Sequence, residues 1–270
     1  MIILNCDGGL CNRMRAIDAA IEYSQLASQE LSVIWRKNRG LNCDYGQLFE
    51  ANPLFEIIHH RWYHYTGQPR HLRNPLRKWI GITLEKSLYD ATFYENDRYR
   101  PDILQVDPVS LKGIKKIYIT NSNNFLKTRR SYAAFRPVGD LRSKIDTIGR
   151  AFPKDIVGVH VRRTDHEQSI RYSTDSTFFS KMKELKDQNP GLNFFLATDD
   201  PFTDDKFKFI WGESILTYPK VFGRNSEQGI QDAVIDLYLL SKTKGILASY
   251  YSSFSEAAAD IGNIPLEIVK

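Results

Sequence analysis

The sequence predicts an α/β protein built from two Rossmann-like domains that face each other across a cleft. Apolar runs alternate with helical segments in the C-terminal half, the N-terminal half opens with the same order of elements, and polar residues directly follow several apolar runs. A chain of 270 residues also exceeds the usual size of a single core. We place the boundary near Pro137, which gives an N-terminal domain over 1–138 and a C-terminal domain over 139–270.

The N-terminal half carries the first elements of one such domain. Apolar residues at helical spacing between positions 14 and 27 predict a helix with one buried face. Residues 40–110 are rich in aromatic residues, Pro and Arg and show no clean period. Apolar runs predict strands at Ile2–Asn5, Leu31–Trp35 and Ile117–Thr120. The opening order of strand, helix and strand is that of a Rossmann-like unit.

The C-terminal half alternates strand and helix signals along its length. Apolar runs predict strands at Ile156–Val161, Asn193–Ala197, Ser214–Thr217, Gly245–Ser249 and Leu266–Val269. Helices are expected between them, over 173–188, Thr203–Trp211, Gly229–Lys244 and 253–262. Polar residues such as Ser173 and Thr174 are good N-caps, and Gly245 is a typical helix stop. This alternation predicts a doubly wound sheet.

Composition restricts the class of protein. The 42% hydrophobic and 26% charged content is typical of a globular protein. No run approaches the roughly 18 apolar residues of a membrane-spanning helix, and the first five residues do not resemble a signal peptide. The odd set Cys6, Cys11 and Cys43 has no metal-ligand spacing and predicts a reducing, cytoplasmic setting. A net charge of +5 suits a small polyanionic ligand and gives no reason to expect nucleic acid.

The segment His160–Glu167 carries the strongest chemical signal. A histidine and two adjacent arginines, Arg162 and Arg163, occur where the apolar strand must end. Ligands of open α/β sheets bind beyond the carboxyl ends of strands, and guanidinium groups make forked hydrogen bonds to phosphate oxygens. The motif predicts a bound phosphate or diphosphate. A surface ion-pair cluster with Asp165 and Glu167 is the alternative.

A second strand end carries similar chemistry. The strand that ends at Ser249 is followed by a helix start, and the serines here are Ser249, Ser252, Ser253 and Ser255. Hydroxyls and free amides at a helix N-terminus bind anions. Capping accounts for one of these serines but hardly for all four. Two anion-binding strand ends in one sheet favour a nucleotide.

Two further positions have both a functional and a purely structural interpretation. The turn with Gly8, Gly9 and Asn12 either approaches a ligand closely or is tight for steric reasons, and it lacks the third glycine of the dinucleotide fingerprint. Asp236 lies within a strongly apolar helix. It either accepts two parallel hydrogen bonds from a guanine in a cleft or is exposed on an amphipathic helix.

These motifs resemble those of the GDP-fucose-dependent fucosyltransferase superfamily, which includes α1,2-, α1,6- and protein O-fucosyltransferases. His160–Asp165 is similar to its His-x-Arg-Arg-x-Asp motif, and Gly8–Arg13 is similar to its Gly-Gly-Leu-Gly-Asn turn. Asp236–Ser241 and residues 248–255 resemble its C-terminal Asp, Leu-Ser and Ser-Ser-Phe-Ser block. The motifs occur in the family's order, and the middle third of the chain is not covered.

The resemblance implies a GT-B fold. It also implies that the protein transfers L-fucose from GDP-fucose, its donor substrate, to an oligosaccharide or polysaccharide. This transfer would invert the configuration of the sugar and need neither a metal nor a cofactor. The N-terminal domain would bind the acceptor and the C-terminal domain the donor. Arg162 would stabilise the departing β-phosphate and Arg163 would support it. The other donor contacts would come from His160 and Asp236 to the guanine, and from Ser252 and Ser253 to the phosphates.

The chain departs from the family at several positions. Cys11 replaces a glycine, and the acidic residue that α1,6-type enzymes use as a base aligns with Ile170. Asp165, His166 or Glu167 could deprotonate the acceptor instead, so the base and the linkage stay open. Residues 59–79 interleave aromatic and cationic side chains, which either stack on an acceptor sugar or form a solvated surface.

No metal site is expected. The acidic pairs Asp199–Asp200 and Asp204–Asp205 are adjacent and are interpreted as helix-cap and surface residues. Two other functions remain open: a nucleotide-dependent enzyme of another class on a Rossmann-like sheet, and a non-catalytic nucleotide-sugar-binding protein. The missing dinucleotide fingerprint and P-loop argue against the first of these.

Overall fold

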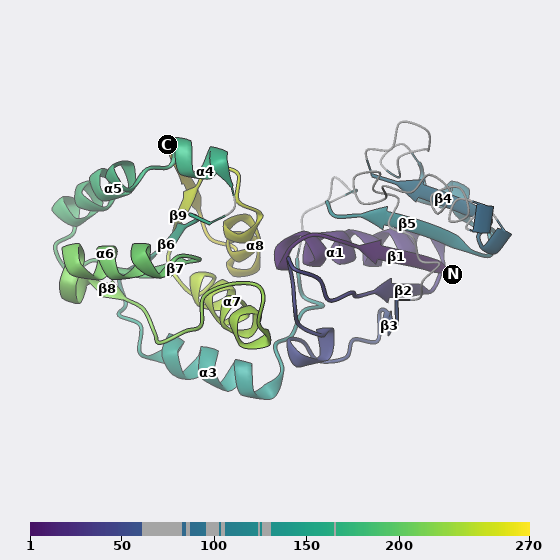
Figure 1. Cartoon of the computed structure of the whole chain (residues 1–270), viewed down its shortest axis with the longest axis horizontal. Coiled ribbons are helices and arrows are strands. Elements are labelled where there is room, and N and C mark those ends of the chain that lie inside the picture. Colours follow the sequence, from purple (N-terminus) through teal and green to yellow (C-terminus); the bar gives the residue numbers. More distant parts are fainter. Residues whose placement is uncertain are drawn as a thin grey trace. The chain divides into compact units, whose positions relative to one another are not determined.

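The computed structural model in Figure 1 divides the chain into two compact units, Met1–Arg136 and Pro137–Lys270. Each unit is described by itself. The structure describes residues 1–60, 83–84, 87–95, 103, 106–123, 125, 131–164 and 166–270. Both units are built on parallel sheets flanked by helices, which confirms the expected α/β class. Within these described ranges no helix is long and apolar enough to cross a membrane.

The first unit is organised around a five-stranded parallel sheet with the order β3-β2-β1-β5-β4. Its strands are β1 (Ile2–Cys6), β2 (Leu31–Ile34), β3 (Glu56–Ile58), β4 (Ala91–Tyr94) and β5 (Ile117–Asn121). The helix α1 (Leu10–Ala27) connects β1 to β2, and short 3-10 turns cover Tyr45–Gln47 and Pro108–Leu111. The order reverses between β1 and β5, so the carboxyl end of β1 lies at a topological switch point.

The second unit has a parallel sheet of the order β10-β9-β6-β7-β8. Its strands are β6 (Ile156–Val161), β7 (Asn193–Thr198), β8 (Ile215–Leu216), β9 (Ile246–Ser249) and β10 (Leu266–Val269). Its helices are α3 (Gly139–Arg150), α4 (Glu167–Tyr172), α5 (Asp175–Gln188), α6 (Pro201–Trp211), α7 (Glu227–Leu240) and α8 (Ser253–Gly262), and a 3-10 turn covers Gly212–Ser214. Figure 1 shows α5 and α6 on one side of the sheet and α7 and α8 on the other. The chain reverses between β6 and β9, which is the switch point of this unit.

The core of the second unit explains why these elements pack as they do. Buried apolar side chains from β6 and β7 meet Phe178 and Met182 of α5 and Phe207 of α6. On the other face α7 approaches β6 closely, because a Cβ at Gly158 would lie 2.8 Å from Leu240 Cδ2. A side chain at that position would force Leu240 to move, so the glycine in the central strand allows this close packing.

The helix boundaries follow their caps. Thr174 accepts a hydrogen bond from the Thr177 N–H (3.3 Å), and Ser226 accepts one from the Gly229 N–H (3.1 Å). Thr174 is one of the expected caps of α5, which confirms the start of that helix, whereas α7 starts two residues before the expected Gly229. The short helix α4, the helix α3 and the strands β3 and β4 were not predicted.

Candidate functional site

The two segments expected to bind anions lie side by side at the switch point of the second unit. His160 of β6 is paired in register with Ala248 of β9. Just beyond the end of β6, the Arg162 backbone N–H donates to the Ser249 side-chain Oγ (3.0 Å). Ligands bind outside the carboxyl ends of strands at such a point. The arginine motif and the serine segment therefore form one candidate site.

The His160 ring is buried, with 7% of the residue exposed, and lies stacked on the Phe254 ring (centroids 4.9 Å apart, planes 24° apart). Its Nδ1 lies 3.4 Å from Ser252 Oγ. Burial lowers the pKa of His160 to about 3; Asp199 opposes this shift, whereas the positive charges of Arg162, Lys220 and Arg224 add to it. The imidazole is therefore neutral near pH 7 and offers hydrogen bonds without a charge.

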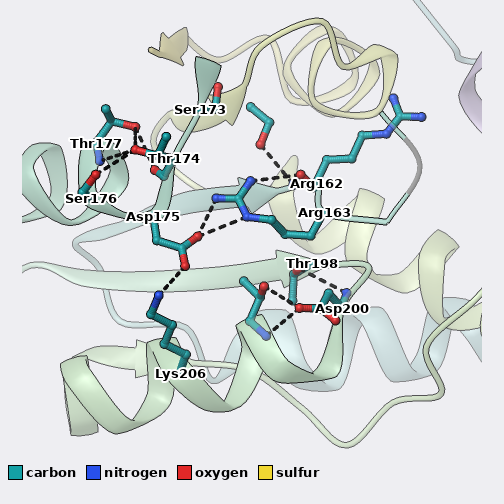
Figure 2. Close-up of polar contacts among 12 residues, drawn as sticks. Arg162, Arg163, Ser173, Thr174, Asp175, Ser176, Thr177, Thr198, Asp200 and Lys206 are labelled. Carbon is teal, nitrogen blue, oxygen red and sulfur yellow. Dashed lines mark hydrogen bonds and ion pairs between the residues drawn. The ribbon is translucent and has the colours of Figure 1, made fainter. Parts of the chain in front are cut away.

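The two adjacent arginines have different surroundings. Figure 2 shows Arg163 turned toward Asp175, with its Nη2 2.6 Å and its Nε 3.1 Å from Asp175 Oδ1. Lys206 Nζ contacts the other oxygen of this carboxylate at 2.6 Å. The Arg162 side chain extends away from this cluster. The local ion-pair interpretation thus holds for Arg163, and the partner that the described residues show is Asp175, which the sequence pattern did not indicate.

The acidic residues after β7 shape the turn that carries the arginines. Asp199 accepts the Arg163 backbone N–H on Oδ1 (2.7 Å) and the Thr164 hydroxyl on Oδ2 (2.6 Å). Asp200 caps α6 by accepting the Thr203 N–H (2.8 Å). Both acids are therefore used by the fold. Within the part of the chain that the structure describes, no group of three or more His, Cys, Asp or Glu side chains is arranged for a metal.

The candidate bases lie around the start of α4. Asp165 lies outside the described residues. Glu167 is exposed in the first turn of α4. His166 caps this helix, since its Nδ1 accepts the Ser169 N–H (3.2 Å), and its ring lies on Tyr251 (centroids 5.3 Å apart). A histidine cap is an unusual helix start, which explains why the sequence pattern did not reveal α4.

Asp236 lies inside α7 and is buried, so the interpretation as an exposed helix residue is wrong. Its Oδ2 lies 2.8 Å from Lys220 Nζ. Its Oδ1 is also buried and has no hydrogen-bond partner among the described residues. Burial raises the pKa of Asp236 to about 6; the Lys220 charge opposes this shift, whereas Asp232 and Asp204 add to it. Sequence reasoning missed Lys220, although Tyr218–Phe222 follows the end of a strand.

Two serines of the second segment make hydrogen bonds within the fold, and the other two lie at the start of α8. Ser249 accepts the Arg162 N–H, and the Ser255 hydroxyl donates to the Ser252 carbonyl (3.2 Å). Ser252 is the N-cap residue of α8 and is buried, and Ser253 is the first residue of the helix. The α8 N-terminus thus lies next to the His160 ring, as the contact with Ser252 shows.

The glycine turn belongs to the first unit and is held by a buried arginine. Gly8 has a φ of +85°, and a Cβ there would lie 3.0 Å from Asn12 Nδ2. Arg13 is fully buried; its Nε donates to the Gly8 carbonyl (2.9 Å) and its guanidinium lies 5.0 Å from the Trp35 ring centroid. The positive φ and the contact with Asn12 give the turn a steric reason for its glycine. Sequence reasoning missed Arg13.

The aromatic and cationic segment over 59–79 lies outside the described residues from position 61 onward. His59 and His60 are described and precede that part of the segment. The structure therefore does not test whether the segment stacks on a sugar.

No protein-family model and no curated protein matches the chain. Solved structures of other proteins do match the chain. The fucosyltransferase NodZ from Bradyrhizobium matches with a TM-score of 0.61 and 16% identity, over 95% of this chain and 91% of that one. FUT1 of Arabidopsis thaliana in complex with GDP matches with a TM-score of 0.61 and 13% identity, over 98% of this chain and 69% of that one.

A third match is POFUT1 in complex with GDP, with a TM-score of 0.55 and 11% identity over 99% of this chain and 97% of that one. The chain has the GT-B-like fold of these proteins. At such low identity the likeness concerns the fold, and the function has to be argued from the site.

Proposed function

We propose that the chain is a fucosyltransferase that moves L-fucose from GDP-fucose to a hydroxyl of a glycan acceptor, with inversion and without a metal. The observation that carries this proposal is the junction at the β6–β9 switch point. There Arg162 contacts the serine segment through Ser249, beside the neutral His160 ring. The structural likeness to proteins solved with GDP or GDP-fucose supports the same assignment.

In this proposal the second unit binds the donor. Asp236 accepts hydrogen bonds from the guanine, and His160 makes the neighbouring contact with the base. Ser252 and Ser253 bind the phosphates at the α8 N-terminus, where free amides favour an anion. The N-terminal domain over 1–138 binds the acceptor.

Arg162 acts on the leaving group. The acceptor oxygen attacks the anomeric carbon of fucose from the side opposite GDP, which inverts its configuration. The bond between that carbon and the β-phosphate oxygen breaks, and the electron pair goes to the departing GDP. A fixed guanidinium stabilises this growing charge more in the transition state than in the ground state. Arg163 instead positions the turn, because its guanidinium is bound to Asp175.

We assign proton removal from the acceptor to Asp165 or Glu167. Glu167 lies three residues before Ile170 in α4, so the two side chains share one face of the helix. A carboxylate at 167 therefore lies about one helical turn from position 170 on the same face. We also place the protein in the cytoplasm, which is supported by the buried free thiols Cys6, Cys11 and Cys43.

Thermal shift and sugar transfer together test the assignment. With EDTA present, GDP and GDP-fucose should raise the melting temperature, whereas ADP and UDP should not. Incubation with GDP-fucose labelled in the sugar and an array of glycans should then place label on an acceptor. Stabilisation without any transfer would favour a nucleotide-sugar-binding protein, and no response to GDP would remove the proposal.

A further inference from the structure

Lys220 is a buried cation to which the proposed function assigns no role. It comes from the segment between β8 and α7, and its Nζ lies 2.8 Å from Asp236 Oδ2. The side chains of Lys220 and Asp236 are only 3% and 8% exposed. The rings of Tyr218 and Phe222 flank the ammonium, with centroids 5.4 Å and 5.7 Å from Nζ.

Holding the segment in place does not account for this lysine. A different acid, Asp232, already fixes the segment: its Oδ2 accepts the Val221 N–H (2.9 Å) and its carbonyl accepts the Tyr218 hydroxyl (2.8 Å). A buried ion pair is expensive to desolvate and adds little stability compared with apolar side chains. The pair between Lys220 and Asp236 therefore calls for a reason other than folding.

The carboxylate of this pair is only half satisfied. Asp236 Oδ2 has Lys220, while Oδ1 is buried and has no partner among the residues that the structure describes. A buried acceptor without a donor is costly and rare in native proteins. A ligand that brings donors to this carboxylate would remove the cost. The pair thus presents one donor, Nζ, beside two acceptor oxygens.

The Watson–Crick edge of guanine has the complementary order. Its O6 is an acceptor, and its N1–H and N2–H₂ groups are donors. We infer that Lys220 donates to O6 while Asp236 accepts from N1 and N2, so that Lys220 is a specificity-determining residue of the donor site. This inference rests on the proposed binding of GDP-fucose and adds a residue to it.

The same arrangement rejects adenine. Adenine has an amino group in place of O6 and a lone pair at N1, so it would set a donor against the Lys220 ammonium and an acceptor against the Asp236 carboxylate. Unpaired polar groups of this kind produce discrimination between ligands. The two side chains are 3% and 8% exposed, so the inference requires the groups that cover them to move aside when the base binds.

Calorimetric titration of the full chain with GDP and with 6-thioguanosine diphosphate tests the inference. The second ligand keeps N1–H and N2–H₂ but replaces O6 by sulfur, a weak acceptor. The wild-type protein should bind GDP about tenfold more tightly than the thio analogue, as expected for one hydrogen bond to a charged donor. Lys220→Met should bind the two ligands within about threefold of each other by the same reasoning.

Lys144→Met is the matched control. Lys144 also pairs with a buried acid of α7, Asp232 (3.2 Å), and lies over the Tyr218 ring. The Lys144→Met substitution therefore removes an ion pair to α7 but keeps the proposed contact between Lys220 and O6. This variant should keep the tenfold preference for GDP.

The outcomes separate the inference from the function on which it rests. If the wild-type protein binds GDP and the thio analogue equally well, the role of Lys220 is overturned while the proposed function stands. This measurement uses only the wild-type protein, so it does not depend on whether a variant folds. A preference that survives in Lys220→Met, or tighter GDP binding by that variant, would overturn this role as well. A wild-type protein that does not bind GDP would remove both proposals.

Discussion

At the scale of single residues, the two adjacent arginines of this chain have different surroundings. Arg163 turns to Asp175 and is committed to the fold, whereas Arg162 extends the other way and contacts the serine segment through its backbone. Arg163 thus holds the turn in place, and the proposed function assigns the ligand contact to Arg162.

Replacing Arg162 by Ala should slow transfer strongly with little effect on folding. The loss of one charge-stabilising contact in the transition state costs about 3 kcal/mol, or roughly a hundredfold in turnover. Initial rates with GDP-fucose measure the first effect, and urea denaturation measures the second. A variant with the wild-type rate would exclude Arg162 from the reaction.

Replacing His160 by Gln should change how stability depends on pH. The folded protein keeps this ring neutral down to about pH 3, whereas the unfolded chain takes up a proton near the ordinary pKa of 6.5. The His160 contribution is thus present above pH 6.5 and is lost as the pH falls toward 3, by about 1.4 kcal/mol per pH unit. Urea denaturation between pH 7 and pH 4 should show a shallower loss for the variant; parallel curves would contradict this.

At the scale of elements, polar contacts decide how strands and helices are joined beyond the sheet. Asp175 at the start of α5 receives Arg163 from the end of β6 and Lys206 from α6. Asp199 at the end of β7 holds the turn after β6. These contacts tie four elements together, α5, α6 and the ends of β6 and β7, so the turn that carries Arg162 is braced.

Removing the Arg163 side chain should therefore weaken the fold. We expect Arg163→Met to lower the free energy of unfolding by about 2 kcal/mol, since Asp175 loses hydrogen bonds to a charged, largely buried partner. Lys183→Met is the matched control on α5, because its pair with Asp187 is exposed and should contribute less than about 0.5 kcal/mol. Equal effects in urea denaturation would show that the Arg163 contact has no special weight.

Element prediction succeeded where the signal is local. The strand β6 has its expected bounds, and α5 starts close to the expected serine and threonine caps. It failed for β3 and β4, which have only three and four residues and lie at the sheet edges. It also failed for α3, where the buried residues are only Leu141 and Ile145. Short or mostly exposed elements leave too few apolar positions to show a period.

At the scale of the whole molecule, each unit places its first strand in the middle of its sheet and reverses direction beside it. In the second unit this reversal brings Ser249 to Arg162 across 87 positions of sequence. The proposed donor contacts gather there, from the ends of two strands and from α7 and α8. The site is thus a product of topology as well as of motifs.

Hydrogen exchange of the full chain should locate the nucleotide. GDP should slow exchange in peptides covering 160–164, 218–236 and 249–256, because a bound ligand stabilises the segments that it contacts. GDP-fucose should add protection around 8–13 if the glycine turn itself contacts the ligand. Protection confined to the first unit would contradict the assignment of the donor to the second.

The sequence by itself determined the α/β class, the alternation of strands and helices in the second unit, and the arginine and serine motifs at strand ends. Apolar runs and caps act between near neighbours, so they can be read along the chain. Only the tertiary structure decided the partners of the charges: Arg163 with Asp175, Lys220 with Asp236, and Arg13 beneath the glycine turn. Which charges meet depends on how strands and loops approach in space, because two charges attract strongly only at a few ångströms and where burial reduces screening by water.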